Sequence, residues 1–132
     1  MAMLAERIFN LLFWLTVALA VVLASLPSPM ALPGNPSDKL LHALAFFVLA
    51  LLAVFAFPRA RVGILLLGLA ALGGAIELIQ GTPQVGREAS WLDWLADLGG
   101  AGFVLVMVRI TRTLSRKHTT LSAPSDTGNR RL

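Results

Sequence analysis

Four long apolar stretches constrain the fold of this chain more than any other feature of its sequence. They cover residues 8–26, 40–57, 62–80 and 92–110. The hydrocarbon core of a bilayer is roughly 30 Å thick and needs about 20 apolar residues of helix to cross it, or about 17 where it is thin. A helix satisfies its own backbone hydrogen bonds, which lipid cannot do. The sequence therefore predicts an all-α membrane protein, a bundle of four transmembrane helices.

The composition separates this chain from the soluble protein classes. Of its 132 residues, 57% are hydrophobic and 14% are charged, whereas soluble domains have about 45 to 50% apolar and about 25% charged residues. The scarcity of charge excludes a disordered chain, and the absence of cysteine excludes a disulfide scaffold. The net charge of +4 does not indicate nucleic-acid binding, because the basic residues flank the apolar stretches. The expected partner is membrane lipid.

The first apolar stretch allows a second interpretation as a secretory signal peptide. Small residues near its end would suit a cleavage site. Its apolar core, however, is longer than the usual ~7 to 15 residues of a signal peptide. The segment before it carries Glu6 next to Arg7, so its positive charge is offset. These features favour a membrane anchor.

The distribution of lysine and arginine predicts the orientation in the membrane. Basic residues precede the first stretch, separate the second from the third and follow the fourth, whereas the other two connections carry only Lys39 and Arg87. The positive-inside rule therefore places both termini in the cytoplasm. We expect a cytoplasmic N-terminus at 1–7, a membrane domain at 8–110, and a basic tail at 111–132 that is disordered or lies on anionic headgroups.

Unusual polar side chains gather near the outer ends of the second, third and fourth predicted helices. Their spacings of three or four residues place each pair on one helix face. Small residues at Ala45, Gly73 and Gly100 continue these faces and allow helix backbones to approach closely in lipid. We expect the three polar faces to meet and form a ligand-binding site, with Trp91 and Trp94 in an interfacial belt beside it. The candidate site residues are Asp38, His42, Glu77, Gln80, Arg87, Asp93 and Asp97.

Two of the acidic candidates have an alternative role in helix capping. Asn35 followed by Pro36 is typical of a helix start and places Asp38 in the first turn, where the helix dipole favours an anion. Ser90 and Asp93 have the spacing of a capping box. The sequence is equally compatible with capping and with binding at these two aspartates.

Glu77 needs a partner more than any other candidate. It lies near the carboxyl end of its predicted helix, where the dipole disfavours an anion, and about one turn inside the apolar stretch. By insertion scales a charge at the centre of a transmembrane helix costs about 2.5 to 3.5 kcal/mol. We therefore expect Glu77 to be protonated or to pair with Arg87, either as a structural pair or as part of the ligand site.

The histidine and the carboxylates of this cluster raise two chemical possibilities. Asp38 could hold His42 in one tautomer, as carboxylates do for histidines that act as general bases or metal ligands. The cluster could also bind a divalent ion, but the sequence has no HExxH or similar compact motif. We therefore expect no metal and no other cofactor. A cysteine nucleophile, a phosphate-binding glycine loop and a GxSxG elbow are absent from the sequence.

Three ordered motifs in this region resemble those of the VanZ-like family of small bacterial membrane proteins. They are DKxxH at 38–42, ExxQ at 77–80 and RxxSxxD at 87–93, the last followed by Asp97 and Gly100. Three motifs in order are more specific than any one alone. One departure is Asp97, where many members carry asparagine, and it adds a negative charge.

This resemblance implies a multi-pass protein of the bacterial cell membrane. The founding member of the family is associated with low-level resistance to the glycopeptide teicoplanin. All of the candidate site residues correspond to polar positions of the family motifs. The ligand expected at the outward polar cluster is a lipid-linked cell-wall precursor or the glycopeptide itself, and a homo-oligomer is compatible with the sequence.

Two classes of function are compatible with an outward polar cluster. The first is a non-enzymatic membrane protein that binds a cell-envelope component on the side where glycopeptides act. The second is an intramembrane hydrolase or transferase in which His42 or a carboxylate acts as general base, with or without a metal, on a lipid-linked substrate. A proton-coupled transporter is disfavoured, because four helices form a narrow bundle and the first two lack buried charge toward the cytoplasm. We expect the binding function.

Overall fold

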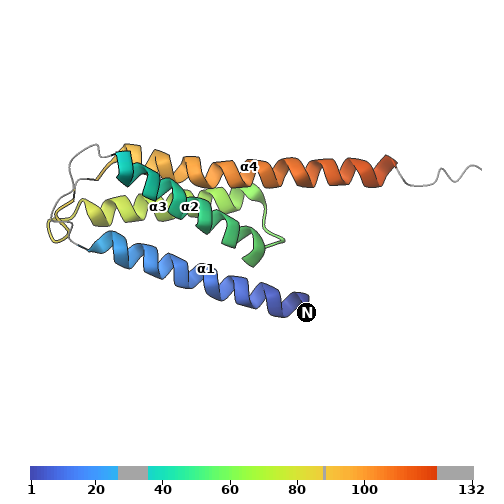
Figure 1. The fold of residues 1–132 in the computed structure, drawn as a ribbon, viewed down its shortest axis with the longest axis horizontal. Coiled ribbons are helices and arrows are strands. Elements are labelled where there is room, and N and C mark those ends of the chain that lie inside the picture. Colours follow the sequence, from blue (N-terminus) through green and yellow to red (C-terminus); the bar gives the residue numbers. More distant parts are fainter. Residues whose placement is uncertain (27–35, 88, 122–132) are drawn as a thin grey trace, which may run out of the picture.

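The computed structural model describes residues 1–26, 36–87 and 89–121, which form four helices (Figure 1). Each of the four helices is long and apolar enough to cross a membrane. The predicted all-α bundle of a multi-pass membrane protein is therefore confirmed. The helices are α1 (Ala2–Ser25), α2 (Pro36–Ala56), α3 (Val62–Gln80) and α4 (Trp91–Leu121).

Two prolines set the limits of α2. Pro36 is its first residue, where the fixed φ of proline suits a helix start and its missing N–H is not needed. Pro58 lies in the turn just beyond Ala56, because proline cannot continue a helix without breaking its hydrogen bonds. The predicted cap by Asn35 lies outside the described residues.

Glycine allows α2 and α4 to pack closely. A Cβ at Gly100 of α4 would overlap the carbonyl oxygen of Ala43 in α2, so only glycine lets the two backbones come this close. Leu49 of α2 is fully buried in the core of the bundle. Of the three small residues predicted at helix contacts, Gly73 and Gly100 lie there, whereas Ala45 is exposed.

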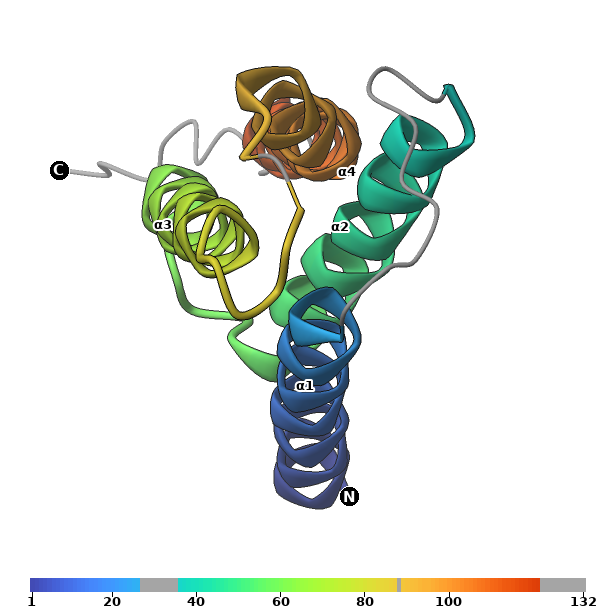
Figure 2. The same ribbon diagram turned by 90° about the vertical axis from the view of Figure 1, so that its left-hand side faces the viewer.

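α1 lies beside the other three helices and packs mainly on α2 (Figure 2). Phe9 stacks on Phe55 with ring centres 5.0 Å apart, and Phe13 meets Phe57 edge to face at 5.4 Å. Among the residues of α1 whose side chains the structure describes, only Phe13 is buried. Most of the surface of α1 is therefore left to lipid.

α4 is longer than its apolar stretch predicts. It continues through Leu121, although the prediction ends the helix at Ile110 and begins a disordered tail there. No proline or glycine interrupts 111–121, and the hydroxyl of Thr113 donates a 2.9 Å hydrogen bond to the carbonyl of Arg109 one turn earlier. The first part of the predicted tail is therefore a polar extension of α4, and the rest of it lies outside the described residues.

The two ends of the bundle differ in chemistry. One end, here called the polar end, holds the first turns of α2 and α4, the last turns of α3 and the connection between α3 and α4. Figure 2 looks onto this end, where α2 and α3 lie on either side of α4. The opposite end, here called the arginine end, carries Arg59, Arg61, Arg109 and Arg112.

Candidate functional site

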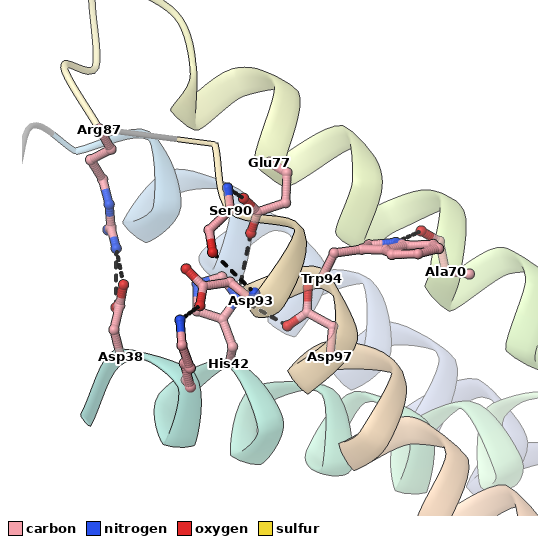
Figure 3. Close-up of polar contacts among 10 residues, drawn as sticks. Asp38, His42, Ala70, Glu77, Arg87, Ser90, Asp93, Trp94 and Asp97 are labelled. Atoms are coloured by element: carbon pink, nitrogen blue, oxygen red, sulfur yellow. Dashed lines mark hydrogen bonds and ion pairs between the residues drawn. The ribbon is translucent and has the colours of Figure 1, made fainter. Parts of the chain in front are cut away.

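The polar end joins α2, the end of α3 and the start of α4 through hydrogen bonds and ion pairs (Figure 3). Its outermost contact is between Arg87, in the α3–α4 connection, and Asp38, in the first turn of α2. One guanidinium nitrogen of Arg87 donates to both carboxylate oxygens of Asp38, at 3.0 and 2.9 Å. The expected pair of Arg87 with Glu77 is therefore wrong.

The path of the connection explains why Arg87 reaches α2. Gly86 has a φ of 65°, a left-handed conformation that glycine adopts without steric cost. The chain turns there, immediately before Arg87. Asp38 sits at the start of α2, where the helix dipole also stabilises its negative charge. The connection is thus fastened to α2 by a charge-assisted contact.

A second contact pairs Lys39 of α2 with Asp93 of α4. Lys39 Nζ lies 2.6 Å from Asp93 Oδ1, and the Asp93 side chain is almost buried. Lys39 was not among the predicted site residues. The signal that could have found it is its place in the first motif, together with the need of a buried aspartate for a cation.

Glu77 caps a helix other than its own. Its Oε2 accepts a 2.7 Å hydrogen bond from the backbone N–H of Ser90, just before α4 begins. In an ordinary capping box the acidic residue three positions later would accept this bond. Here Asp93 uses its carboxylate on Lys39, while its own N–H donates to the hydroxyl of Ser90 at 3.3 Å. The predicted capping box is therefore half correct.

This arrangement offsets the unfavourable position of the Glu77 carboxylate at the carboxyl end of α3. The dipole of α3 disfavours an anion at its carboxyl end, but the same carboxylate lies at the amino end of α4, where a dipole favours it. The orphan amide at the start of α4 is satisfied in return. Glu77 therefore links α3 to α4, and the favourable dipole of α4 opposes the unfavourable dipole of α3.

The deepest contact is between His42 of α2 and Asp97 of α4. Nδ1 of His42 lies 2.9 Å from Oδ1 of Asp97 and 4.0 Å from Oε1 of Glu77. Asp97, and not Asp38 as expected, is thus the carboxylate that orients the imidazole. Two buried carboxylate oxygens, Glu77 Oε1 and Asp97 Oδ2, have no hydrogen-bond partner among the described residues.

Trp94 and Gly73 close the inner side of this cluster. The indole N–H of Trp94 donates a 2.9 Å hydrogen bond to the carbonyl of Ala70 in α3, so Trp94 joins α3 and α4, and its place in an interfacial belt stays a prediction. A Cβ on Gly73 would lie 2.8 Å from Asp97 Oδ2. Glycine at this position therefore leaves the space that the buried carboxylate of Asp97 occupies. Trp91 is exposed, as a belt residue would be.

A cavity of about 330 Å³ adjoins the cluster between α1, α2 and α3. Its polar wall is formed by Asp38, His42, Gln80 and Arg87. Its remaining wall is apolar and includes Leu23 of α1 and other small or apolar side chains. Four of the seven predicted site residues therefore face one cavity, and the other three are Glu77, Asp93 and Asp97, which lie buried among the helices behind it.

Two groups of side chains in the cluster could hold a metal ion. In each group the nitrogen and oxygen atoms that could act as ligands lie within 4.8 Å of one another. The groups share His42. The outer group consists of Asp38, His42 and Asp93, and the deeper group of His42, Glu77 and Asp97.

Comparisons of this chain with protein-family models, with curated proteins and with solved structures found no match. The three sequence motifs nevertheless meet in space. Four of the polar contacts described above join two different motifs: Asp38 to Arg87, Lys39 to Asp93, His42 to Asp97, and Glu77 to Ser90. The residues that carry the resemblance thus form one cluster, and their role in binding stays a prediction.

Proposed function

We propose that this chain is a VanZ-like membrane protein that binds an amphiphilic cell-envelope component, a lipid-linked wall precursor, in the cavity at its polar end. The observation that carries the proposal is the division of the cavity into two walls. One wall is lined by charged and polar side chains, and the other by apolar side chains of α1 and its neighbours. A ligand with a phosphate headgroup and a prenyl chain matches both walls.

Arg87 is the main contact proposed for the headgroup. A guanidinium has five N–H donors, and Asp38 occupies those of one nitrogen atom. The remaining donors suit a phosphate, which arginine binds with directed hydrogen bonds. Gln80 and His42 line the same wall and supply further polar contacts. Asp38 holds the guanidinium in place.

The prenyl chain would lie against α1. This helix has one buried side chain, Phe13, among those the structure describes, and in its polar-end half Val17, Val21 and Ala24 pack on the core while only partly buried. Leu23 and Leu41 form part of the cavity wall at this place. A chain from the bilayer can therefore enter beside α1 without breaking a packed core.

The proposed orientation places the polar end outside and the arginine end in the cytoplasm of a bacterial cell. It is supported by the positive-inside rule, since Arg59, Arg61, Arg109 and Arg112 all lie at the arginine end. Reporter fusions should report an outside position near Gly86 and an inside position near Arg59. The link to teicoplanin rests on the motif resemblance alone.

The binding experiment uses undecaprenyl phosphate and the intact protein in detergent micelles. Arg87→Gln should weaken binding about tenfold or more, because hydrogen bonds to a charged group contribute about 1.5 to 3 kcal/mol. Arg59→Gln is the matched control, since it removes an arginine at the opposite end and should bind as the wild type does. Undecaprenol, which lacks the phosphate, should bind more weakly to the wild type than undecaprenyl phosphate. Equal binding by both variants, or no preference for the phosphate, would refute the proposal.

An intramembrane enzyme is the second candidate, and one observation favours it. A buried carboxylate, Asp97, orients Nδ1 of a histidine that lines the cavity, which is the arrangement of a general base and its orienting group. Incubation of the wild type with undecaprenyl diphosphate should then release inorganic phosphate, and His42→Gln should abolish the release. Binding without any turnover leaves the non-enzymatic function.

A further inference from the structure

We propose that His42, Glu77 and Asp97 form a binding site for one divalent transition-metal ion, of the Zn²⁺ or Mn²⁺ type, between α2, α3 and α4. This site lies deeper than the contact of Arg87 with Asp38, shares His42 with the cavity wall, and does not depend on the proposed lipid ligand. It goes against the expectation from the sequence, where the absence of a compact metal motif argued for no metal. Here the ligands come from three separate helices.

The first argument is that the ligand oxygens are enclosed and unpartnered. The Glu77 side chain is 9% exposed, and its Oε1 has no hydrogen-bond partner although it lies 4.0 Å from His42 Nδ1. The Asp97 side chain is 1% exposed, and its Oδ2 is also without a partner among the described residues. Buried carboxylate oxygens without partners are rare and costly. A cation bound by the two carboxylates would satisfy Glu77 Oε1 and compensate the charge of Asp97.

The second argument is the balance of charge. Asp38 is paired with Arg87, and Asp93 is paired with Lys39. No lysine or arginine of the described residues is paired with Glu77 or Asp97, whose only basic neighbour within 4.0 Å is His42. Two ionised carboxylates with a neutral imidazole carry two negative charges. A divalent ion balances that charge without any further residue.

The third argument is distance. Bonds of about 2.0 to 2.1 Å in a tetrahedral site separate the ligand atoms by roughly 3.3 to 3.4 Å. The distances from His42 Nδ1 to Asp97 Oδ1 and to Glu77 Oε1, 2.9 and 4.0 Å, lie on either side of that value. Small side-chain rotations would therefore close the site around an ion, and the 2.7 Å bond from Ser90 to the other Glu77 oxygen would hold that carboxylate in place.

The kind of metal follows from the ligand atoms. Mg²⁺ and Ca²⁺ prefer sets made of oxygen alone, whereas an imidazole nitrogen with carboxylates suits Zn²⁺, Mn²⁺ and their neighbours. His42 also lines the cavity. An ion at this site would therefore lie next to any ligand bound there.

The test begins with wild-type protein purified through a tag without histidine, stripped with a chelator and exposed to Zn²⁺ or Mn²⁺ with no lipid added. Mass spectrometry of the metal content should find about one ion per chain, and the ion should raise Tm because it binds the folded protein. Glu77→Gln keeps an oxygen for the amide of Ser90 but removes the charge, and should weaken metal binding about tenfold or more. Glu6→Gln, which removes a carboxylate at the arginine end, should bind as the wild type does.

Several outcomes would overturn the site. One is a wild-type protein that keeps neither ion and whose Tm is unchanged by both, which would mean that a shared proton satisfies the two carboxylates. Another is equal metal retention by Glu77→Gln, or by Asp97→Asn if the first variant does not fold.

A further experiment leaves the site unchanged, since His118→Gln leaves His42 as the sole histidine of the chain. Pulsed EPR of that Mn²⁺-loaded protein should detect a bound nitrogen, and an ion held by oxygen alone would exclude His42.

Discussion

The polar end and the arginine end of this bundle carry charge in different surroundings. At the polar end every carboxylate of α2, α3 and α4 has a partner on another element, and these side chains are largely enclosed. At the arginine end Arg59 lies 3.1 Å from Glu6, yet the Arg59 side chain is 83% exposed. Exposed pairs contribute about 0 to 1 kcal/mol, whereas a buried polar group without a partner costs several times more. The loss of stability on substituting a charged side chain should therefore depend on how far that side chain is buried, and not on the charge itself.

The largest effect on stability is expected where the backbones of α2 and α4 touch near the polar end. Gly100→Ala places a methyl group against the carbonyl of Ala43, and overpacking of this kind costs about 1 to 3 kcal/mol or more. Gly102→Ala on the same helix meets nothing within 4 Å and should stabilise α4 by up to about 1 kcal/mol. Unfolding in a detergent titration, followed by circular dichroism, measures both. Similar losses in the two variants would contradict the close packing.

The next effect is the energetic coupling of the ion pairs at the two ends. Double-mutant cycles with Asp38→Asn and Arg87→Gln should give a coupling of about 1 to 2 kcal/mol, because each single change strands a half-buried charge. The matched cycle of Glu6→Gln and Arg59→Gln should give less than about 0.5 kcal/mol. Free energies of unfolding from detergent titrations supply both values. Equal coupling at the two ends would mean that enclosure is not the deciding quantity.

A smaller effect is expected for the hydroxyl that caps α4. Ser90→Ala removes the acceptor of the Asp93 amide while leaving the bond from the Ser90 amide to Glu77 in place. Loss of such a cap costs about 1 kcal/mol. In the control Ser25→Ala, the lost hydroxyl bond goes to a carbonyl inside α1, so the free energy of unfolding should change by less than about 0.5 kcal/mol. If the control lost as much free energy of unfolding as Ser90→Ala, the Ser90 hydroxyl would have no special role as a helix cap.

The smallest effect is expected at the far end of α4. Truncation after Lys117 removes residues that carry little apolar surface, so the free energy of unfolding should change by less than about 0.5 kcal/mol. Thermal unfolding of the truncated protein and its yield in the membrane fraction measure this. Failure of the truncated chain to assemble would show that the residues after Lys117 are needed for folding, in addition to the contacts of the core.

Local composition was sufficient to predict the four helices, apart from the extension of α4, and the end of the bundle at which the polar side chains gather. α3 has the predicted bounds, Val62–Gln80, because an arginine before it and a glycine after it limit an unbroken apolar run. The spacing of His42, Glu77 and Asp97 also placed them correctly near one end of the bundle. These features depend on residues close together in sequence, which hydropathy and helical periodicity describe well.

The pairing of the site residues could not be predicted, because it depends on helix rotation and on one turn. Arg87 is nearer to Glu77 in sequence, but the left-handed Gly86 directs the chain so that Arg87 reaches Asp38. The acidic partner of the Ser90 amide comes from α3 and not from the capping-box position. The hydrogen bond from Trp94 to Ala70 could not be predicted for the same reason, since it requires the relative position of two helices.

The bond from Glu77 to the amide of Ser90 has a consequence for how the chain enters a membrane. Inserted alone, α3 would bring Glu77 into an apolar phase with no donor, and α4 would arrive with an unsatisfied amide at its start. When the two helices are inserted as a pair, the Ser90 amide before α4 donates to Glu77, and Glu77 of α3 accepts from that amide. The connection between them is short, from Gly81 to Ser90, so the donor and the acceptor are never far apart. α3 and α4 thus form a helical hairpin that is best inserted as one unit.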